Sequence, residues 1–211
     1  MTPSEPTAGA TGSGGDRRRA LVLVDVNNAF FDPRGEFNYA AAAEVLPGIR
    51  RLLEAARASE TPVVHVREAH YPDHPDFETQ KLPVHSIAGE FDAAPYPGFE
   101  ARPGEPELGK RRYSAFFATD LALLLRERQV EEVIFAGVKT NVCIRASVQD
   151  AFAHGFWPVL VRGAVNSNRP HLHEASLEDV ERYFGEVIGL DEALVRLGRM
   201  GDPPTAKEAA S

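Results

Sequence analysis

The sequence has one cysteine, Cys143, among 211 residues, and it lacks long apolar runs. A single cysteine cannot form a disulfide within the chain, which excludes disulfide-stabilised secreted scaffolds and predicts a reducing, cytoplasmic location. No run approaches the roughly 18 apolar residues of a membrane-spanning helix. Residues 16–26 place three arginines before an apolar stretch, as an export signal does. Asp25 interrupts that stretch, which is more typical of a strand.

Positive charge is also in deficit. The chain has 23 Lys and Arg residues against 31 Asp and Glu residues, giving a formal net charge of −8. Nucleic-acid binding needs clustered positive charge, so we expect no nucleic-acid partner, and the lack of apolar runs predicts no membrane partner. The remaining composition, 43% hydrophobic and 26% charged residues, is typical of one soluble globular domain.

Small and polar residues dominate both ends of the sequence. Residues 1–18 and 201–211 offer few apolar side chains to bury, so we expect a disordered N-terminal tail and a flexible C-terminal tail. Residues 19–200 are then expected to form a single domain.

Between these tails, strand and helix patterns alternate. Continuous apolar runs predict buried strands over residues 20–26, 62–66, 131–138 and 157–163. Apolar residues at helical spacing predict helices over residues 49–56, 121–125, 142–154 and 170–184. A last strand and helix are expected through Val187 and on to Leu197. This alternation predicts an α/β fold with a doubly wound, mostly parallel sheet and helices on both faces.

In such sheets, ligands bind outside the carboxyl ends of the strands. Asp25 ends the first predicted strand, Cys143 follows the third, and Asn166 with Ser167 follow the fourth. Residues 71–109 are rich in proline and have no clear period. We expect them to form a long ordered excursion that covers the site.

Cys143 has two interpretations. A free cysteine is often a small core residue. The position just inside a predicted helix N-terminus suits a nucleophile better, because the partial positive charge there lowers the pKa of a thiol. The free N–H groups of that first turn can also hold an oxyanion.

Two further features accompany the cysteine. An acid such as Asp25 is costly to bury without a partner, so it either caps a nearby loop or helix or accepts the thiol proton as a base. The basic residues 110–112 directly precede an apolar, aromatic stretch. At least one of these basic side chains is therefore expected to point inward.

Three stretches carry a resemblance to a known family: LVLVDVNNAFFDPRG, KRRYSAFFATDL and GVKTNVCIRASVQDAFAHGF. With these stretches in this order, the chain resembles the isochorismatase-like cysteine hydrolases over residues 20–197. It is most similar to their ureidoacrylate and N-carbamoyl amide amidohydrolase branch. The resemblance implies a Rossmann-like three-layer sandwich, a small-molecule amide or ureido substrate, no cofactor, and a homodimer or homotetramer.

The resemblance also implies a set of catalytic residues. The Asp-Lys-Cys triad of the family falls on Asp25, Lys110 and Cys143. Asp25 would accept the thiol proton and return it to the leaving amine, Lys110 would hold the charges in place, and Cys143 would attack the carbonyl. A cis peptide between Val138 and Lys139 would aim the N–H of Lys139, together with that of Cys143, at the oxyanion.

Six residues are expected to bind the substrate: Asn27, Phe31, Tyr113, Thr140, Arg145 and Asn166. Asn27 either orients the substrate or closes the strand end together with Asn28. Arg145 either pairs with a substrate carboxylate or forms a salt bridge with Asp150 or another neighbour. Lys139 stands where many family members have a small residue, and its side chain either reaches solvent or shapes the pocket.

Nicotinamidases of this family bind a metal through an Asp-x-His…His pattern. The stretch REAHYPDHPDF offers Glu68, His70 and His74 as candidate ligands, and carboxylate with imidazole suits zinc or another divalent ion. Other members carry a similar stretch without needing a metal, so we expect none here.

These observations predict a metal-independent cysteine hydrolase that cleaves a C–N bond in a small amide, lactam or carbamoyl compound through an acyl-enzyme on Cys143. The enzymatic alternatives are an antibiotic-inactivating hydrolase of the streptothricin hydrolase type, a nicotinamidase-type amidase and an isochorismatase-type enol ether hydrolase. The alternative from another class is a binding protein that has kept the fold and lost the chemistry.

Overall fold

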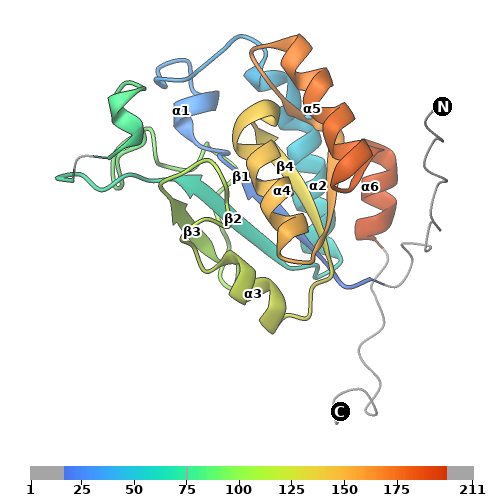
Figure 1. Cartoon of the computed structure of the whole chain (residues 1–211). Helices are drawn as coiled ribbons and strands as arrows, with labels where there is room; N and C mark the ends of the chain where they lie inside the picture. The colour runs from blue at the N-terminus through green and yellow to red at the C-terminus, as the bar shows by residue number, and fades with distance from the viewer. Residues whose placement is uncertain (1–16, 75, 199–211) are drawn as a thin grey trace, which may run out of the picture.

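The computed structural model describes residues 17–74 and 76–198, which form a three-layer α/β fold (Figure 1). The sheet consists of β1 (Arg19–Val24), β2 (Val63–Glu68), β3 (Glu107–Lys110), β4 (Glu132–Val138), β5 (Trp157–Asn166) and β6 (Glu186–Gly189). The strand order is β3-β2-β1-β4-β5-β6, and every neighbouring pair is parallel. The predicted doubly wound parallel sheet is confirmed. From β1, successive strands are added first on one side (β2, β3) and then on the other (β4, β5, β6). The strand order therefore reverses between β1 and β4, which is the place where such sheets bind ligands.

The helices are α1 (Asn28–Phe31), α2 (Leu46–Ala58), α3 (Leu121–Glu127), α4 (Arg145–Ala153), α5 (Pro170–Tyr183) and α6 (Leu190–Leu197). Three shorter turns complete them: η1 (Ala42–Val45), η2 (Glu78–Gln80) and a π-helical turn, η3 (Thr140–Ile144). The single helix predicted over residues 142–154 is therefore divided into η3 and α4. None of these described helices is long and apolar enough to cross a membrane.

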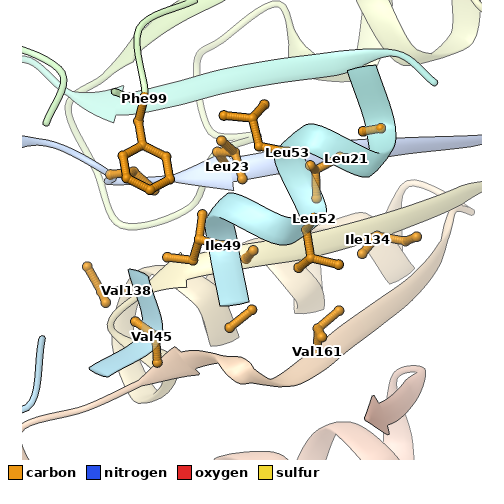
Figure 2. Packing of buried hydrophobic residues seen from close by; sticks show 14 of the residues in the cluster. Leu21, Leu23, Val45, Ile49, Leu52, Leu53, Phe99, Ile134, Val138 and Val161 are labelled. Atoms are coloured by element: carbon orange, nitrogen blue, oxygen red, sulfur yellow. The ribbon is translucent and has the colours of Figure 1, made fainter. Parts of the chain in front are cut away.

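Alternating side chains of the strands build one core on each face of the sheet. In β1, Leu21 and Leu23 face the layer of α2 and α6, where Ile49, Leu52 and Leu53 are buried against them (Figure 2). The intervening residues of β1 belong to a second core, which α3, α4 and α5 cover. Each fully buried Leu or Ile side chain stabilises the fold by about 1.5–3 kcal/mol. Strands buried on both faces explain why β1 and β4 are continuous apolar runs in the sequence.

Gly137 allows β4 to approach β1 closely at its carboxyl end. A Cβ atom at this position would lie 1.9 Å from the carbonyl oxygen of Val24, and the backbone φ of 127° is one that other residues rarely adopt. Because Asp25 directly follows Val24, this contact brings the turn after β4 next to Asp25. Glycine is thus needed at position 137 for the turn after β4 to lie next to Asp25.

The proline-rich excursion lies over the carboxyl ends of β1 and β2. It is attached to them by backbone hydrogen bonds, such as Asn28 N–H to the carbonyl of Ala94 and His70 N–H to the carbonyl of Ser86. It also contains an unpredicted element, because its last residues begin β3. Strand β3 has four residues and lies at the edge of the sheet, so it lacks the apolar run that reveals the central strands.

Candidate active site

Asp25 stands immediately after β1 with a positive φ of 55°. Its side chain is fully buried, and one carboxylate oxygen, Oδ1, accepts a hydrogen bond of 2.8 Å from the backbone N–H of Glu68. Its own N–H donates to the carbonyl of Val66. The end of β2 therefore fixes the orientation of the carboxylate and leaves Oδ2 for another partner.

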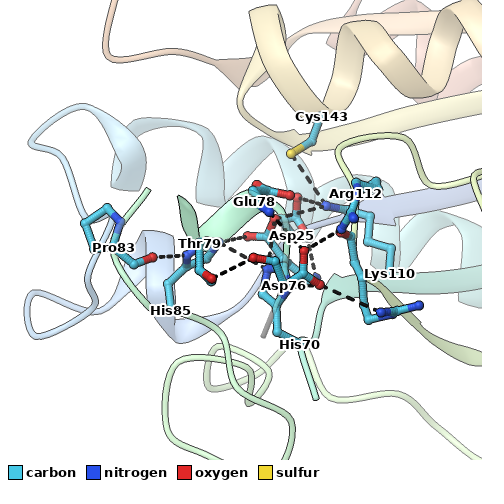
Figure 3. Close-up of polar contacts among 12 residues, drawn as sticks. Asp25, His70, Asp76, Glu78, Thr79, Pro83, His85, Lys110, Arg112 and Cys143 are labelled. Atoms are coloured by element: carbon cyan, nitrogen blue, oxygen red, sulfur yellow. Dashed lines mark hydrogen bonds and ion pairs between the residues drawn. The ribbon is translucent and has the colours of Figure 1, made fainter. Parts of the chain in front are cut away.

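That partner is Lys110, the last residue of β3. The register of β3 against β2 pairs Lys110 with Glu68, which brings the lysine side chain beside Asp25. The ammonium nitrogen lies 2.9 Å from Asp25 Oδ2 and 3.5 Å from Cys143 Sγ, and the whole side chain is buried. Figure 3 shows the sulfur directed toward this cluster. Side chains from positions 25, 110 and 143 thus meet at one point, as the sequence predicted.

Cys143 lies in the η3 turn, between β4 and α4, and is 4% exposed. Ser147 holds this turn, since its hydroxyl donates to the carbonyl of Cys143 at 2.6 Å and accepts from the N–H of Ala115 at 2.8 Å. The peptide bond between Val138 and Lys139 is cis. Among the described residues, the backbone N–H of Lys139 has no hydrogen-bond acceptor, so it is free to bind an oxygen.

The electrostatics of the cluster correct one expectation. Burial raises the pKa of the Cys143 thiol well above its ordinary value, and the Lys110 ammonium offsets this only in part. A lowered pKa was expected from the position at a helix N-terminus, and the shift is instead upward. Burial likewise raises the pKa of Asp25, which makes this carboxylate a stronger base. The resting sulfur is therefore a thiol with a base beside it.

This assignment makes the alkylation of Cys143 depend on pH in a defined way. A raised pKa keeps Cys143 in the unreactive thiol form up to a higher pH. The rate at which iodoacetamide labels the folded protein should therefore continue to increase above about pH 8.5, the ordinary pKa of a cysteine. The same chain in guanidinium chloride provides the matched control, because it has no other cysteine. Labelling of the folded protein that is rapid and independent of pH below about pH 8 would contradict the assignment.

A cavity of about 180 Å³ opens beside the sulfur. It is lined by Phe30, Phe37, Glu68, Glu78, Leu82, Tyr113, Lys139, Val142 and Cys143. Of the six residues predicted to bind substrate, Tyr113 lines this cavity. Leu82 and Glu78 come from the excursion, which carries no motif that would have identified them, and Phe37 comes from the loop after α1.

The side chains of three other predicted residues have structural contacts, and that of a fourth, Asn27, is buried outside the cavity lining. Phe31 packs against Tyr96 in the core, and its neighbour Phe30 lines the cavity in its place. Thr140 is hydrogen-bonded to His173 through its hydroxyl. Asn166 bonds to Tyr39 and Ala41 and so anchors the loop before η1. The backbone of Asn27 pairs with that of Pro95, but both polar atoms of its buried side chain lack a partner among the described residues, so its role in substrate binding stays a prediction.

Arg145 also lies outside the cavity lining. Its guanidinium donates to Asp179 of α5 at 2.9 Å and stacks over the ring of Phe184. The salt-bridge interpretation of Arg145 therefore agrees with the structure, with Asp179 as the partner instead of Asp150. If a cation in the cavity pairs with a substrate carboxylate, it must therefore belong to a residue other than Arg145.

A second cluster of donor groups adjoins the triad. The ligand atoms of Glu68, His70, Glu78 and His85 all lie within 4.8 Å of one another, and all four residues are buried. Both carboxylate oxygens of Glu78 lack a hydrogen-bond partner among the described residues. Two carboxylates with two imidazoles suit zinc or another divalent transition metal, so these residues fit a metal ion. His74, the third ligand suggested by the sequence, is exposed beside Tyr71, and Glu78 and His85 lie in the cluster instead.

The fold agrees with that of the known proteins that the chain resembles. A family model for the isochorismatase domain matches residues 19–192. Maleamate amidohydrolase from Pseudomonas putida is 33% identical over 186 residues, covering 86% of this chain and 87% of that protein. Ureidoacrylate amidohydrolase from Methylobacterium radiotolerans is 30% identical over 206 residues, covering 82% of this chain and 78% of that protein.

A solved structure extends the comparison to three dimensions. The nicotinamidase/pyrazinamidase of Bacillus subtilis has a TM-score of 0.77 and 30% identity to this chain, covering 81% of this chain and 98% of that one. The family model spans β1 to the start of α6, which includes every strand of the sheet and all three residues of the predicted triad. The chain therefore belongs to the isochorismatase family.

Proposed function

We propose that this protein hydrolyses a C–N bond of a small amide or ureido compound through a covalent acyl-enzyme on Cys143. One observation carries the proposal: a buried thiol, an ammonium 3.5 Å from it and a carboxylate 2.9 Å from that ammonium meet at the wall of a cavity. A sulfur nucleophile with an adjacent base is the arrangement that acyl transfer requires.

The first half of the reaction uses each of the three groups. Asp25 accepts the thiol proton while Cys143 Sγ forms a bond to the substrate carbonyl carbon. The carbonyl oxygen becomes an oxyanion, which the backbone N–H groups of Lys139 and Cys143 stabilise. Asp25 then returns the proton to the nitrogen, the C–N bond breaks, and ammonia or an amine leaves a thioester on Cys143.

The second half reverses these roles with water. Asp25 takes a proton from a water molecule whose oxygen attacks the thioester carbonyl, and the proton finally returns to the departing thiol sulfur. The product is a carboxylic acid from an amide and a carbamic acid from a ureido compound. Lys110 remains an ammonium throughout, because Asp25 and Cys143 hold the pKa of Lys110 above its usual range despite the effect of burial. Its positive charge stabilises the anionic states of both neighbours.

A divalent metal ion held by Glu68, His70, Glu78 and His85 would supply a Lewis acid beside the cavity, next to the substrate carbonyl or its water. The steps above use only Asp25, Lys110, Cys143 and backbone N–H groups. We therefore keep a metal-independent mechanism as the proposal.

The relatives support an amide substrate. The curated proteins that match this chain over most of its length are named as maleamate and ureidoacrylate amidohydrolases. A structural neighbour is named as a nicotinamidase/pyrazinamidase. We extend to this chain the feature that these names share, hydrolysis of a small amide or ureido compound. A homodimer or homotetramer in the cytoplasm remains part of this proposal, and light scattering after size exclusion measures the assembly.

A substrate panel tests the proposed reaction. The purified protein should release ammonia from at least one of maleamate, ureidoacrylate and nicotinamide at a rate proportional to enzyme concentration, since each offers an unhindered amide or ureido carbonyl. A coupled ammonia assay measures the rate. Inclusion of a streptothricin lactam and of isochorismate distinguishes the alternatives. Turnover of isochorismate without ammonia release from any amide would contradict the proposal and favour enol ether hydrolysis.

A further inference from the structure

Lys139 contributes more to the site than its backbone N–H. Its side chain lines the cavity beside Cys143 and is half-buried there. The ammonium nitrogen lies 5.5 Å from the ring centroid of Phe30, and 5.4 Å from those of Phe37 and Tyr39. Three aromatic faces around one ammonium hold it by cation–π interactions and restrict its rotamers. The cation is therefore fixed in place inside the cavity.

This ammonium forms no ion pair with the two carboxylates that line the same cavity, Glu68 and Glu78. Within residues 17–74 and 76–198, no hydrogen bond or ion pair joins Lys139 to another side chain. The other charged lysine of the site, Lys110, is paired with Asp25. Glu68 lies 3.2 Å from His85, 3.8 Å from His70 and 4.0 Å from Lys110, so its charge is already balanced.

A partly buried cation that forms no ion pair is costly, and a bound anion would lower that cost. Burial lowers the pKa of Lys139, and the nearby Cys143 and Glu68 offset this only in part. Arg145, the residue that the sequence suggested for a substrate carboxylate, is paired with Asp179 outside the cavity. Among the described residues that line the cavity, Lys139 is the cation free for a ligand.

We propose that the Lys139 ammonium binds a carboxylate of the substrate, so that the preferred substrates are amides or ureido compounds that carry a carboxylate near the scissile bond. This inference rests on the proposed function. In the proposed reaction the N–H of Lys139 binds the oxyanion, and its side chain lines the same cavity, so this one residue would contact the substrate at two points. The backbone N–H and the ammonium belong to one residue and are separated by the length of a single lysine side chain. This short separation favours small substrates whose carboxylate lies close to the carbonyl.

Two pairs of compounds test this inference, each pair differing only in charge: maleamate against its neutral diamide, and ureidoacrylate against its neutral amide. Lys139→Met keeps the length and the aromatic contacts of the side chain but removes its charge. We expect Lys139→Met to raise KM for both carboxylates at least thirtyfold, with kcat changed less than threefold. For the neutral compounds, kcat/KM should change less than threefold. Lys139→Arg should retain most of the preference. Lys81→Met, at an exposed lysine, is the matched control.

Binding to Cys143→Ala separates this inference from the proposed reaction. Calorimetry should give a tighter Kd for each carboxylate than for its neutral partner, and Lys139→Met in that background should abolish the difference. If the native protein hydrolyses none of the four compounds but this charge-dependent binding is present, the proposed reaction fails and the anion site stands. If the native protein treats charged and neutral partners alike, or Lys139→Met weakens both equally, the anion site is wrong while amide hydrolysis stands.

Discussion

Replacing Cys143 with alanine should lower kcat/KM for amide hydrolysis by about 10⁴-fold or more, because the proposed reaction forms its acyl bond to the sulfur of this residue. The base and the ammonium are useless without a nucleophile, so the loss should be close to that of removing all three groups. The fold should survive. Removing one sulfur atom from a small buried side chain costs about 1 kcal/mol of the free energy of unfolding. Steady-state kinetics and urea denaturation measure the two effects.

Cys143→Ser is the matched variant for this prediction. Serine keeps the size and the hydrogen-bonding geometry, but its hydroxyl loses a proton far less readily than a thiol, so activity should also be lost. Both variants should still bind substrate, since the cavity walls are unchanged. If Cys143→Ala kept more than about 1% of the native kcat/KM, sulfur would not be the nucleophile and acyl-enzyme chemistry would have to be abandoned.

Lys110→Met should have the largest effect on stability. The ammonium of Lys110 is the partner of a fully buried carboxylate, and breaking a buried ion pair by removing one partner costs about 3–5 kcal/mol. Activity should fall by about 10³-fold or more, since the charges of Asp25 and the attacking sulfur lose their stabilising cation. The loss of stability should be largest at high pH. It should shrink as pH falls, because protonation of Asp25 removes the unpaired charge.

The double variant Asp25→Asn with Lys110→Met separates stability from catalysis. With both charges removed, most of the lost free energy of unfolding should return, but activity should stay absent because the base is gone. Arg162 and Glu174, an exposed pair 3.2 Å apart, provide the control. Arg162→Met should cost less than about 1 kcal/mol. Equal costs for Lys110→Met and Arg162→Met in urea denaturation would contradict the buried ion pair.

The fold was largely predictable because its central strands are buried on both faces. The apolar runs of β1 and β4 and the helical spacing of Ile49, Leu52 and Leu53 reflect local burial, which a sequence pattern records directly. The meeting of Asp25, Lys110 and Cys143 was predicted from a family resemblance, and their distances agree with it. Their catalytic roles stay predictions.

The rest depended on tertiary structure that leaves no periodic pattern. Strand β3 is a short edge strand, and its register alone places Lys110 beside Asp25. Glu78 and His85 reach the second cluster through an irregular excursion, so no spacing rule links them to Glu68. The pKa of Cys143 depends on how deeply the turn is buried, which the helix position alone could not reveal. The three aromatic rings around the Lys139 ammonium likewise come from residues 30–39, which are far from Lys139 along the sequence.

Rapid acid quench followed by mass spectrometry tests the central claim most directly. The native protein is mixed with a substrate that it hydrolyses and quenched within one turnover, then digested and compared with Cys143→Ala. The account predicts a mass increase equal to the substrate less ammonia or amine, confined to the peptide that contains Cys143 and absent from the variant. An unmodified Cys143 peptide while ammonia is released, or an acyl group on another residue, would contradict it.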